Sequence, residues 1–115
     1  MLKARYDCAG MRTLNGQYEL DDAVAAFFGA WTLRFIARDE YVTGRFGREG
    51  VIRGSVNGHE LSAQWHDKQR NGWLRVRFAP SFKTGELEYG VNTNGTSVGH
   101  STMTRVVRST RLKGE

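Results

Sequence analysis

Short runs of alternating polarity, each with a small residue near its centre, strongly limit what this chain can fold into. Between Tyr41 and Trp65, a large apolar residue, a small residue and a second large apolar residue recur at alternate positions in three successive runs. A period of two is typical of strands that bury one face. The three sets are Val42, Gly44 and Phe46; Ile52, Gly54 and Val56; and Leu61, Ala63 and Trp65.

Turn signals separate these runs at short intervals. The chain contains 14 glycines and one proline. Asn57-Gly58 is typical of a tight type I′ hairpin turn, because both positions of that turn need a positive φ. Further turn signals lie at 47–50, 67–72, 79–81 and 92–95. Successive runs are therefore expected to pair as an antiparallel meander.

A glycine at mid-strand on the inward face predicts a tightly coiled sheet, because it relieves crowding on the inner side. Closure into a barrel also removes exposed edges. We therefore predict an all-β fold with a short N-terminal helix, in which an up-and-down meander closes into a small barrel of seven to eight strands. A flat twisted sheet with a helix on one face is the alternative. Strands are expected at 30–36, 41–46, 51–57, 60–66, 73–78, 84–91 and 101–108.

The first 28 residues do not share this pattern. Asp21 or Asp22 is suited to cap the N-terminus of a helix, and good helix formers follow. We expect a short helix at about 20–28 that plugs or packs against the barrel, although residues 12–20 could instead form another hairpin. The expected organisation is an N-terminal segment over 1–28, a barrel domain over 29–108 and a basic flexible tail over 109–115.

Length and composition indicate one domain in a reducing compartment. The chain has 115 residues and one cysteine, Cys8, which cannot form an internal disulfide. The N-terminus lacks the apolar core of a secretory signal, and no stretch approaches the roughly 20 apolar residues of a membrane helix. We expect a cytoplasmic protein without a membrane partner. Its formal charge of +5 permits an acidic partner.

The residues that could catalyse a reaction form no recognisable pattern. His59, His66 and His100 lie near turns without the spacing of a metal site. Glu86 and Glu88 share a strand face, which suits either paired acid–base groups or a solvated face opposite arginines. We expect no enzymatic activity, no cofactor and no metal.

The residues GAWTLRF at 29–35 are followed by DEYVTGRFG at 39–47 and by hairpins bearing GSV, SAQW and FKTGELEYG. This rhythm, over roughly residues 29–91, resembles the avidin and lipocalin group, the calycin barrels. The resemblance implies one ligand pocket at the open barrel mouth and places Trp31 across the barrel floor. Avidin-like proteins have hydrogen-bonding side chains soon after this tryptophan, whereas Leu33 and Phe35 occupy those inward positions here. This departure counts against biotin as the ligand.

A small, mostly apolar ligand inside the barrel is the first functional expectation. A barrel of about eight strands is either just filled by side chains or has room for one small ligand. The small mid-strand residues favour space slightly, and a solid core is the alternative. The expected lining residues are Trp31, Phe35, Phe46, Trp65, Phe78 and Tyr89.

An interaction through the outer face is the alternative function. Strand parity places arginines and aromatic residues on the outward side of consecutive strands, where they could follow a phosphate backbone and stack on bases. The same surface could dock an acidic protein or a second copy of the chain, or could simply be a solvated exterior. Its members are Arg34, Arg45, Arg53, Arg75, Arg77, Tyr41 and Trp73.

Overall fold

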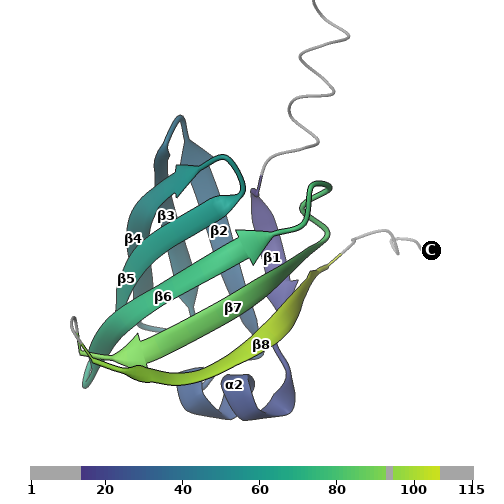
Figure 1. Cartoon of the computed structure of the whole chain (residues 1–115). Coiled ribbons are helices and arrows are strands. Elements are labelled where there is room, and N and C mark those ends of the chain that lie inside the picture. The colour runs from purple at the N-terminus through teal and green to yellow at the C-terminus, as the bar shows by residue number, and fades with distance from the viewer. Residues whose placement is uncertain (1–13, 93–94, 107–115) are drawn as a thin grey trace, which may run out of the picture.

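The computed structural model describes residues 14–92 and 95–106. Eight antiparallel strands follow one another in chain order around a closed barrel, and one helix connects the first two strands (Figure 1). The predicted closed meander is therefore confirmed, and the flat sheet is wrong. The strands are β1 (Gly16–Glu19), β2 (Thr32–Arg38), β3 (Tyr41–Phe46), β4 (Gly50–Asn57), β5 (Glu60–His66), β6 (Asn71–Phe78), β7 (Thr84–Val91) and β8 (Ser97–Arg105), and the helix is α2 (Asp22–Phe28).

Strand β1 closes the barrel and comes from the segment before residue 29. It pairs with β2 over its whole length, and with β8 through Tyr18 opposite Arg105 and Glu19 opposite Thr104. The N–H of Val106 extends this seam by donating to the carbonyl of Gln17 at 2.8 Å. Cys8 and the tail expected at 109–115 lie outside the described residues.

The mid-strand glycines lie where the neighbouring backbone leaves no room for a side chain. A Cβ on Gly44 would lie 2.6 Å from the carbonyl oxygen of Arg34 on the neighbouring strand β2. A Cβ on Gly54 would lie 2.2 Å from the carbonyl oxygen of Ser62. Both distances are too short for any side chain, so the glycines permit the tight coiling that closes the barrel.

Inward side chains from all eight strands form one hydrophobic core. At the end away from the helix, the ring of Tyr18 lies 5.9 Å from that of Phe35 and 5.4 Å from that of Phe78, measured between centroids. The Tyr18 hydroxyl donates to the carbonyls of Leu14 and Phe82, at 2.9 and 3.2 Å. Burial raises the pKa of Tyr18 to about 12, against the opposing effect of the nearby Arg105. The phenol is thus a neutral, fully bonded part of the core.

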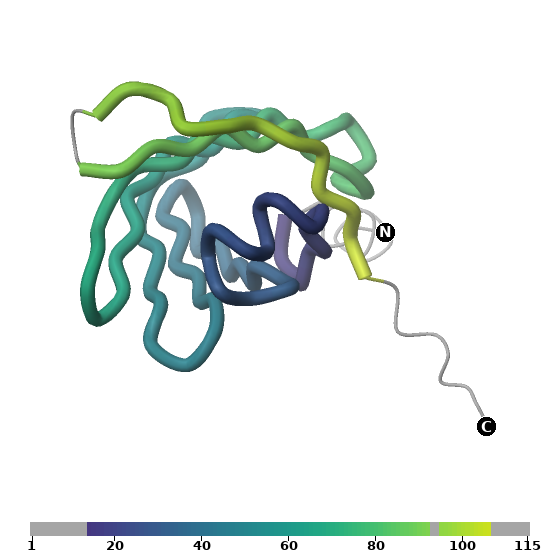
Figure 2. Tube along the Cα trace, turned by 90° about the horizontal axis from the view of Figure 1, so that it is seen from below, coloured from purple at the N-terminus to yellow at the C-terminus, as the bar shows by residue number. Residues whose placement is uncertain are grey.

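Helix α2 lies within the ring of strands and closes one end of the barrel, as the view along the barrel shows (Figure 2). Asp21 is the N-cap, because its carboxylate accepts a hydrogen bond from the N–H of Val24 at 3.0 Å. The hydroxyl of Ser101 on β8 also donates to Asp21, and this bond lowers the pKa of Asp21 together with the one from Val24. The helix ends at Gly29, which has a φ of 69°. The predicted helix and its cap are confirmed.

The expected position of Trp31 is wrong. The side chain is 67% exposed and does not cross the barrel floor. Strand β2 begins only at Thr32, so Trp31 belongs to the connection that follows the left-handed Gly29 rather than to the inward row of a strand. Phe28, on the last turn of α2, is buried at this end of the barrel instead.

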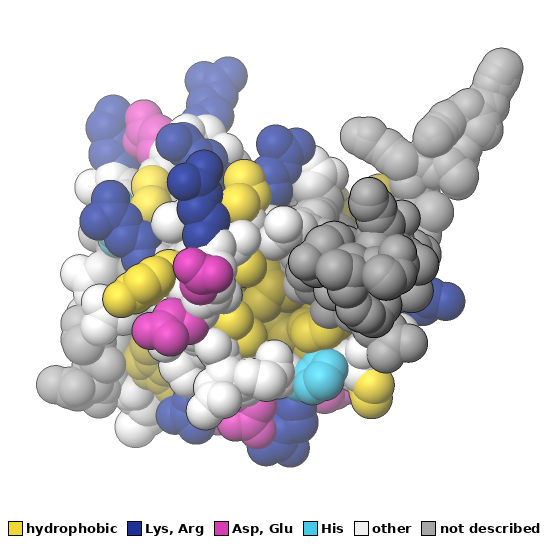
Figure 3. Space-filling model, turned by 90° about the horizontal axis from the view of Figure 1, so that it is seen from above, with side chains coloured by type: hydrophobic (Ala, Val, Ile, Leu, Met, Phe, Trp, Pro, Cys, Tyr) yellow, Lys and Arg dark blue, Asp and Glu magenta, His cyan; other side chains and the backbone are white. Residues whose placement is uncertain are grey.

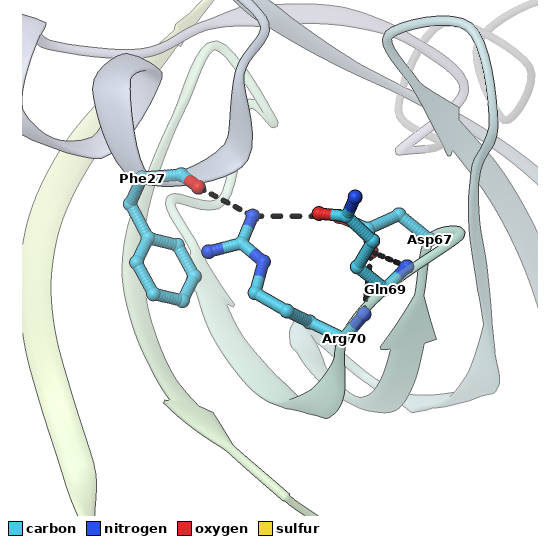
Figure 4. Close-up of polar contacts among 4 residues, drawn as sticks. All are labelled: Phe27, Asp67, Gln69 and Arg70. Atoms are coloured by element: carbon cyan, nitrogen blue, oxygen red, sulfur yellow. Dashed lines mark hydrogen bonds and ion pairs between the residues drawn. The ribbon is translucent and has the colours of Figure 1, made fainter.

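Arg70 joins the end of α2 to the β5–β6 turn (Figure 4). Its guanidinium donates to the carbonyl of Phe27 at 2.6 Å and lies 3.4 Å from the carboxylate of Asp67. It also lies over the rings of Phe27 and Trp65, with its Cζ 4.7 and 5.5 Å from their centroids. Asp67 accepts the backbone N–H groups of Gln69 and Arg70 as well. This group of contacts, here called the Arg70 latch, holds the helix on the barrel end.

The glycine at position 54 gives the first prediction. Replacing glycine by alanine normally stabilises slightly through the unfolded chain, but here the new methyl group would meet the backbone of Ser62 and Ala63. We expect Gly54→Ala to lower the free energy of unfolding by about 1–3 kcal/mol. Ser55→Ala, on the exposed side of the same strand, should change it by less than about 0.5 kcal/mol. Urea denaturation measures both, and an unchanged midpoint for Gly54→Ala would show that the strands are further apart.

The Arg70 latch gives the second prediction. Arg70→Ala should reduce the free energy of unfolding by about 1–2 kcal/mol, because it leaves the carbonyl of Phe27 and the carboxylate of Asp67 without their charged donor, in a partly solvated setting. Lys68→Ala is the matched control, since the pair of Lys68 with Glu49 is highly exposed on both sides. Equal losses for the two variants would contradict a role for the latch.

The pKa of Asp67 makes the latch sensitive to acid. Burial opposes ionisation of this carboxyl, but the N–H groups of Gln69 and Arg70 and the guanidinium of Arg70 outweigh it and hold the pKa below the usual 3.8. The stabilisation is therefore present above pH 3.8 and is lost as the pH falls towards the folded-state pKa. We expect Asp67→Asn to flatten, in part, the decline of stability on acidification, measured by urea denaturation between about pH 2 and pH 6. An unaltered slope would contradict this assignment.

Candidate functional site

Five of the six residues expected inside the barrel are there. Phe35, Phe46, Trp65, Phe78 and Tyr89 are each 5% exposed or less. Trp31 is the exception already described. Tyr18, which shares this interior, was missed because its four-residue strand is too short to show alternation.

The interior rings at the helix end contact one another. The ring of Phe28 lies 5.1 Å from that of Phe46, 5.4 Å from that of Trp65 and 5.2 Å from that of Tyr89, between centroids. Phe27 lies 4.6 Å from Tyr89. A ligand at this end would have to displace these rings.

The opposite end is where the calycin resemblance implies a pocket mouth. A view onto that end shows hydrophobic side chains near its centre and several Lys and Arg side chains around them (Figure 3). The ring of Phe82 packs 5.4 Å from Phe78 and is stacked on the imidazole of His59 at 4.7 Å. A ligand inside the barrel remains a prediction.

The outer face carries the arginines where strand parity placed them. Arg34, Arg45, Arg53, Arg75 and Arg77 are all exposed. Tyr41 is 67% exposed, and Trp73 is half-buried.

An open hollow of about 700 Å³ lies on the outer face of β3–β6. Its floor contains Ser55 and Ser62, which are cross-strand partners. Tyr41 faces Ser55 from β3, and Arg75 faces Ser62 from β6. Two small side chains thus lie between two large ones along one row of the sheet, and this difference in size creates the hollow.

A second row of side chains completes the lining. Arg53, Gln64 and Trp73 are successive partners across β4, β5 and β6. The indole N–H of Trp73 donates to the carbonyl of Gly95 at 2.7 Å, which fixes the ring. The guanidinium of Arg75 lies over that ring, with its Cζ 5.2 Å from the centroid. We call this site the outer hollow, and its main side chains are Tyr41, Arg53, Ser55, Ser62, Gln64, Trp73 and Arg75.

The outer hollow is bordered by positive charge on the side of β2, β3 and β4, whereas opposite charges alternate on the side of β7. The lining contains two arginines and no acidic residue. Strands β2, β3 and β4 have no acidic residue in their sequences, whereas β7 carries Glu86 and Glu88 opposite Arg77 and Arg75. Arg77 also forms an ion pair with Glu60 at 3.2 Å. The sequence could not distinguish Arg77 from the other arginines, because the distinction depends on strand register.

Two further features bear on the chemistry of the site. The described part of the chain has no group of three or more His, Cys, Asp or Glu side chains placed to hold a metal ion. Within the same residues, no helix has both the length and the hydropathy needed to cross a membrane.

Comparison with known proteins provides no relative for this chain. No family model, no curated protein and no solved structure matches it.

Proposed function

We propose that this protein binds single-stranded nucleic acid through the outer hollow. The observation that supports this most is the composition of the hollow: an exposed tyrosine and two arginines surround two serines, and no acidic residue lines it. Proteins that bind single strands combine a positive groove with aromatic side chains on which bases stack. The net charge of +5 would favour association with a polyanion.

Each side chain of the hollow suits one part of a nucleotide. The ring of Tyr41 is exposed enough to stack on an unpaired base. Arg53 has no ion pair to any carboxylate among the described residues, so its guanidinium is available to a phosphate. The hydroxyls of Ser55 and Ser62 and the amide of Gln64 lie beside these two side chains on β4 and β5 and can bond to base edges or sugar.

The interior of the barrel is the less favoured site. Membership of the calycin group remains a proposal that the eight-stranded meander supports, and it would place a ligand among the inward rings. Those rings are buried against one another, whereas the outer hollow is open without any rearrangement. We therefore place the function on the outer face.

Binding of a fluorescent oligothymidylate of about 12 nucleotides tests the proposal by anisotropy. We expect Tyr41→Ala to weaken binding by about tenfold through loss of stacking, while Tyr41→Phe, which keeps the ring, stays near wild type. Arg53→Ala should weaken binding by about tenfold through loss of a charged hydrogen bond. Arg48→Ala removes the same charge from the β3–β4 turn, outside the hollow, and should have a smaller effect.

The dependence on salt provides a separate check. The logarithm of the binding constant should fall linearly with the logarithm of the salt concentration. An equal loss of affinity in Arg48→Ala and Arg53→Ala would show that binding depends on net charge alone and not on the outer hollow. Two results together would indicate an acidic protein as the partner instead of nucleic acid. An acidic peptide would displace the oligonucleotide at equal concentration, and Tyr41→Ala would have no effect on binding.

A further inference from the structure

Two arginines of the outer face are placed directly against each other. Arg34 on β2 and Arg45 on β3 are cross-strand partners, and both are exposed. Like charges in this arrangement destabilise a sheet. Among the described residues, no carboxylate lies within ion-pair distance of either guanidinium. Two positive charges are therefore held together, and no ion pair among the described residues offsets them.

An open hollow of about 280 Å³ is lined by both arginines. Gln17 on β1 is the partner of Arg34 on its other side, so Gln17, Arg34 and Arg45 form a row across three strands. Thr32 and Gly47 also line the hollow. Glu19 faces Thr32 across β1 and β2 but is not part of the lining. The lining thus offers two guanidiniums, an amide and a hydroxyl, and no carboxylate.

We infer that this second hollow binds a phosphate dianion, the terminal phosphomonoester of a nucleic acid strand. Two guanidiniums can each bind phosphate oxygens in a bidentate manner. A phosphomonoester carries close to two negative charges above its second pKa of about 6, whereas a phosphodiester within a strand carries one. The paired arginines therefore match the charge of a strand end better than that of an internal linkage.

The position of the second hollow fits the path of a strand into the outer hollow. Arg53 faces Thr43, which makes it the diagonal neighbour of Arg45, at a Cα separation of roughly 7–8 Å. Arg53 in turn lines the outer hollow beside Tyr41. A strand whose end is held at Arg34 and Arg45 would pass Arg53 before its bases reach Tyr41. This inference rests on the proposed function for the identity of the ligand, but not for the presence of the phosphate site.

The test compares one internally labelled oligothymidylate with a 5′-phosphate, a 3′-phosphate or hydroxyls at both ends. We expect one phosphorylated form to bind about tenfold more tightly than the hydroxyl form, and the end that is preferred gives the polarity of the strand. Arg34→Ala and Arg45→Ala should each abolish this preference. Arg38→Ala is the matched control, since Arg38 is exposed on the same strand but outside the hollow, and it should keep the preference. Equal affinity for all three forms of the oligonucleotide, or a preference for a phosphorylated end that persists in Arg34→Ala, would overturn the inference.

A second measurement separates this inference from the proposed function. Inorganic phosphate, added to the wild-type protein, should shift the amide resonances of residues around Arg34 and Arg45 and raise the melting temperature, and Arg34→Ala should lose both effects. If phosphate has these effects but no oligonucleotide binds, the phosphate site is supported and the proposed binding of nucleic acid is contradicted. If oligonucleotides bind but phosphate has no effect and neither strand end is preferred, the proposed function is supported and the phosphate site at Arg34 and Arg45 is contradicted. The preference for a phosphorylated strand end should also weaken below about pH 6, where the phosphomonoester dianion takes up a proton.

We expect both arginine variants to fold. Removal of either arginine relieves like-charge repulsion, so the melting temperature of Arg34→Ala without phosphate should equal or exceed that of the wild type. A large drop in the melting temperature would show that the arginine pair stabilises the fold, and would contradict the premise that the two arginines repel each other.

Discussion

The close approach of neighbouring backbones at Gly44 and Gly54 is the constraint on which the rest of the structure depends. At both positions the next strand occupies the space that a Cβ would need, so the sheet can coil far enough for β1 to meet β8. Closure then separates an interior of aromatic and aliphatic side chains from an exterior that carries the charged ones. The same pair of strands shapes the outside, because the outward partners Ser55 and Ser62 are small as well. Where β4 pairs with β5, small residues therefore lie on both faces of the sheet, which permits the tight coiling and leaves the outer hollow open.

A closed barrel has two ends, and helix α2 fills only one of them. Helix α2 fills one end with Phe28, and the Arg70 latch holds it there through the carbonyl of Phe27. The cap of the same helix is tied to β8 by the bond from Ser101 to Asp21. The helix is therefore attached to strands on both sides of the barrel, which suits a permanent plug better than a moving lid.

Local patterns predicted most of the fold because strands and turns are local features. Alternation and Asn57-Gly58 predicted the meander, and Asp21 predicted the start of the helix. Residues 12–20 were expected to form at most an alternative hairpin, whereas β1 is a single strand that closes the barrel. The sequence did not reveal this because Gly16 and only four residues give no alternation, and the closing partner β8 is distant in sequence. Trp31 was misplaced because a Gly-x-Trp sequence does not reveal where the left-handed turn at Gly29 ends and β2 begins. Parity identified which arginines face outward, but which of them face a carboxylate depends on register.

Register divides the exterior of the barrel into two electrostatic halves. On β6 and β7, Arg75 and Arg77 face Glu88 and Glu86, so charges of opposite sign alternate and their fields largely cancel beyond a Debye length. On β2, β3 and β4, arginines occur without any acidic residue in the strands, and Arg34 lies opposite Arg45. A random distribution of charge for solubility would not concentrate one sign where it destabilises the sheet. The cost in stability is understandable if an anion binds there, because the bound anion attracts both guanidiniums and offsets the repulsion between them.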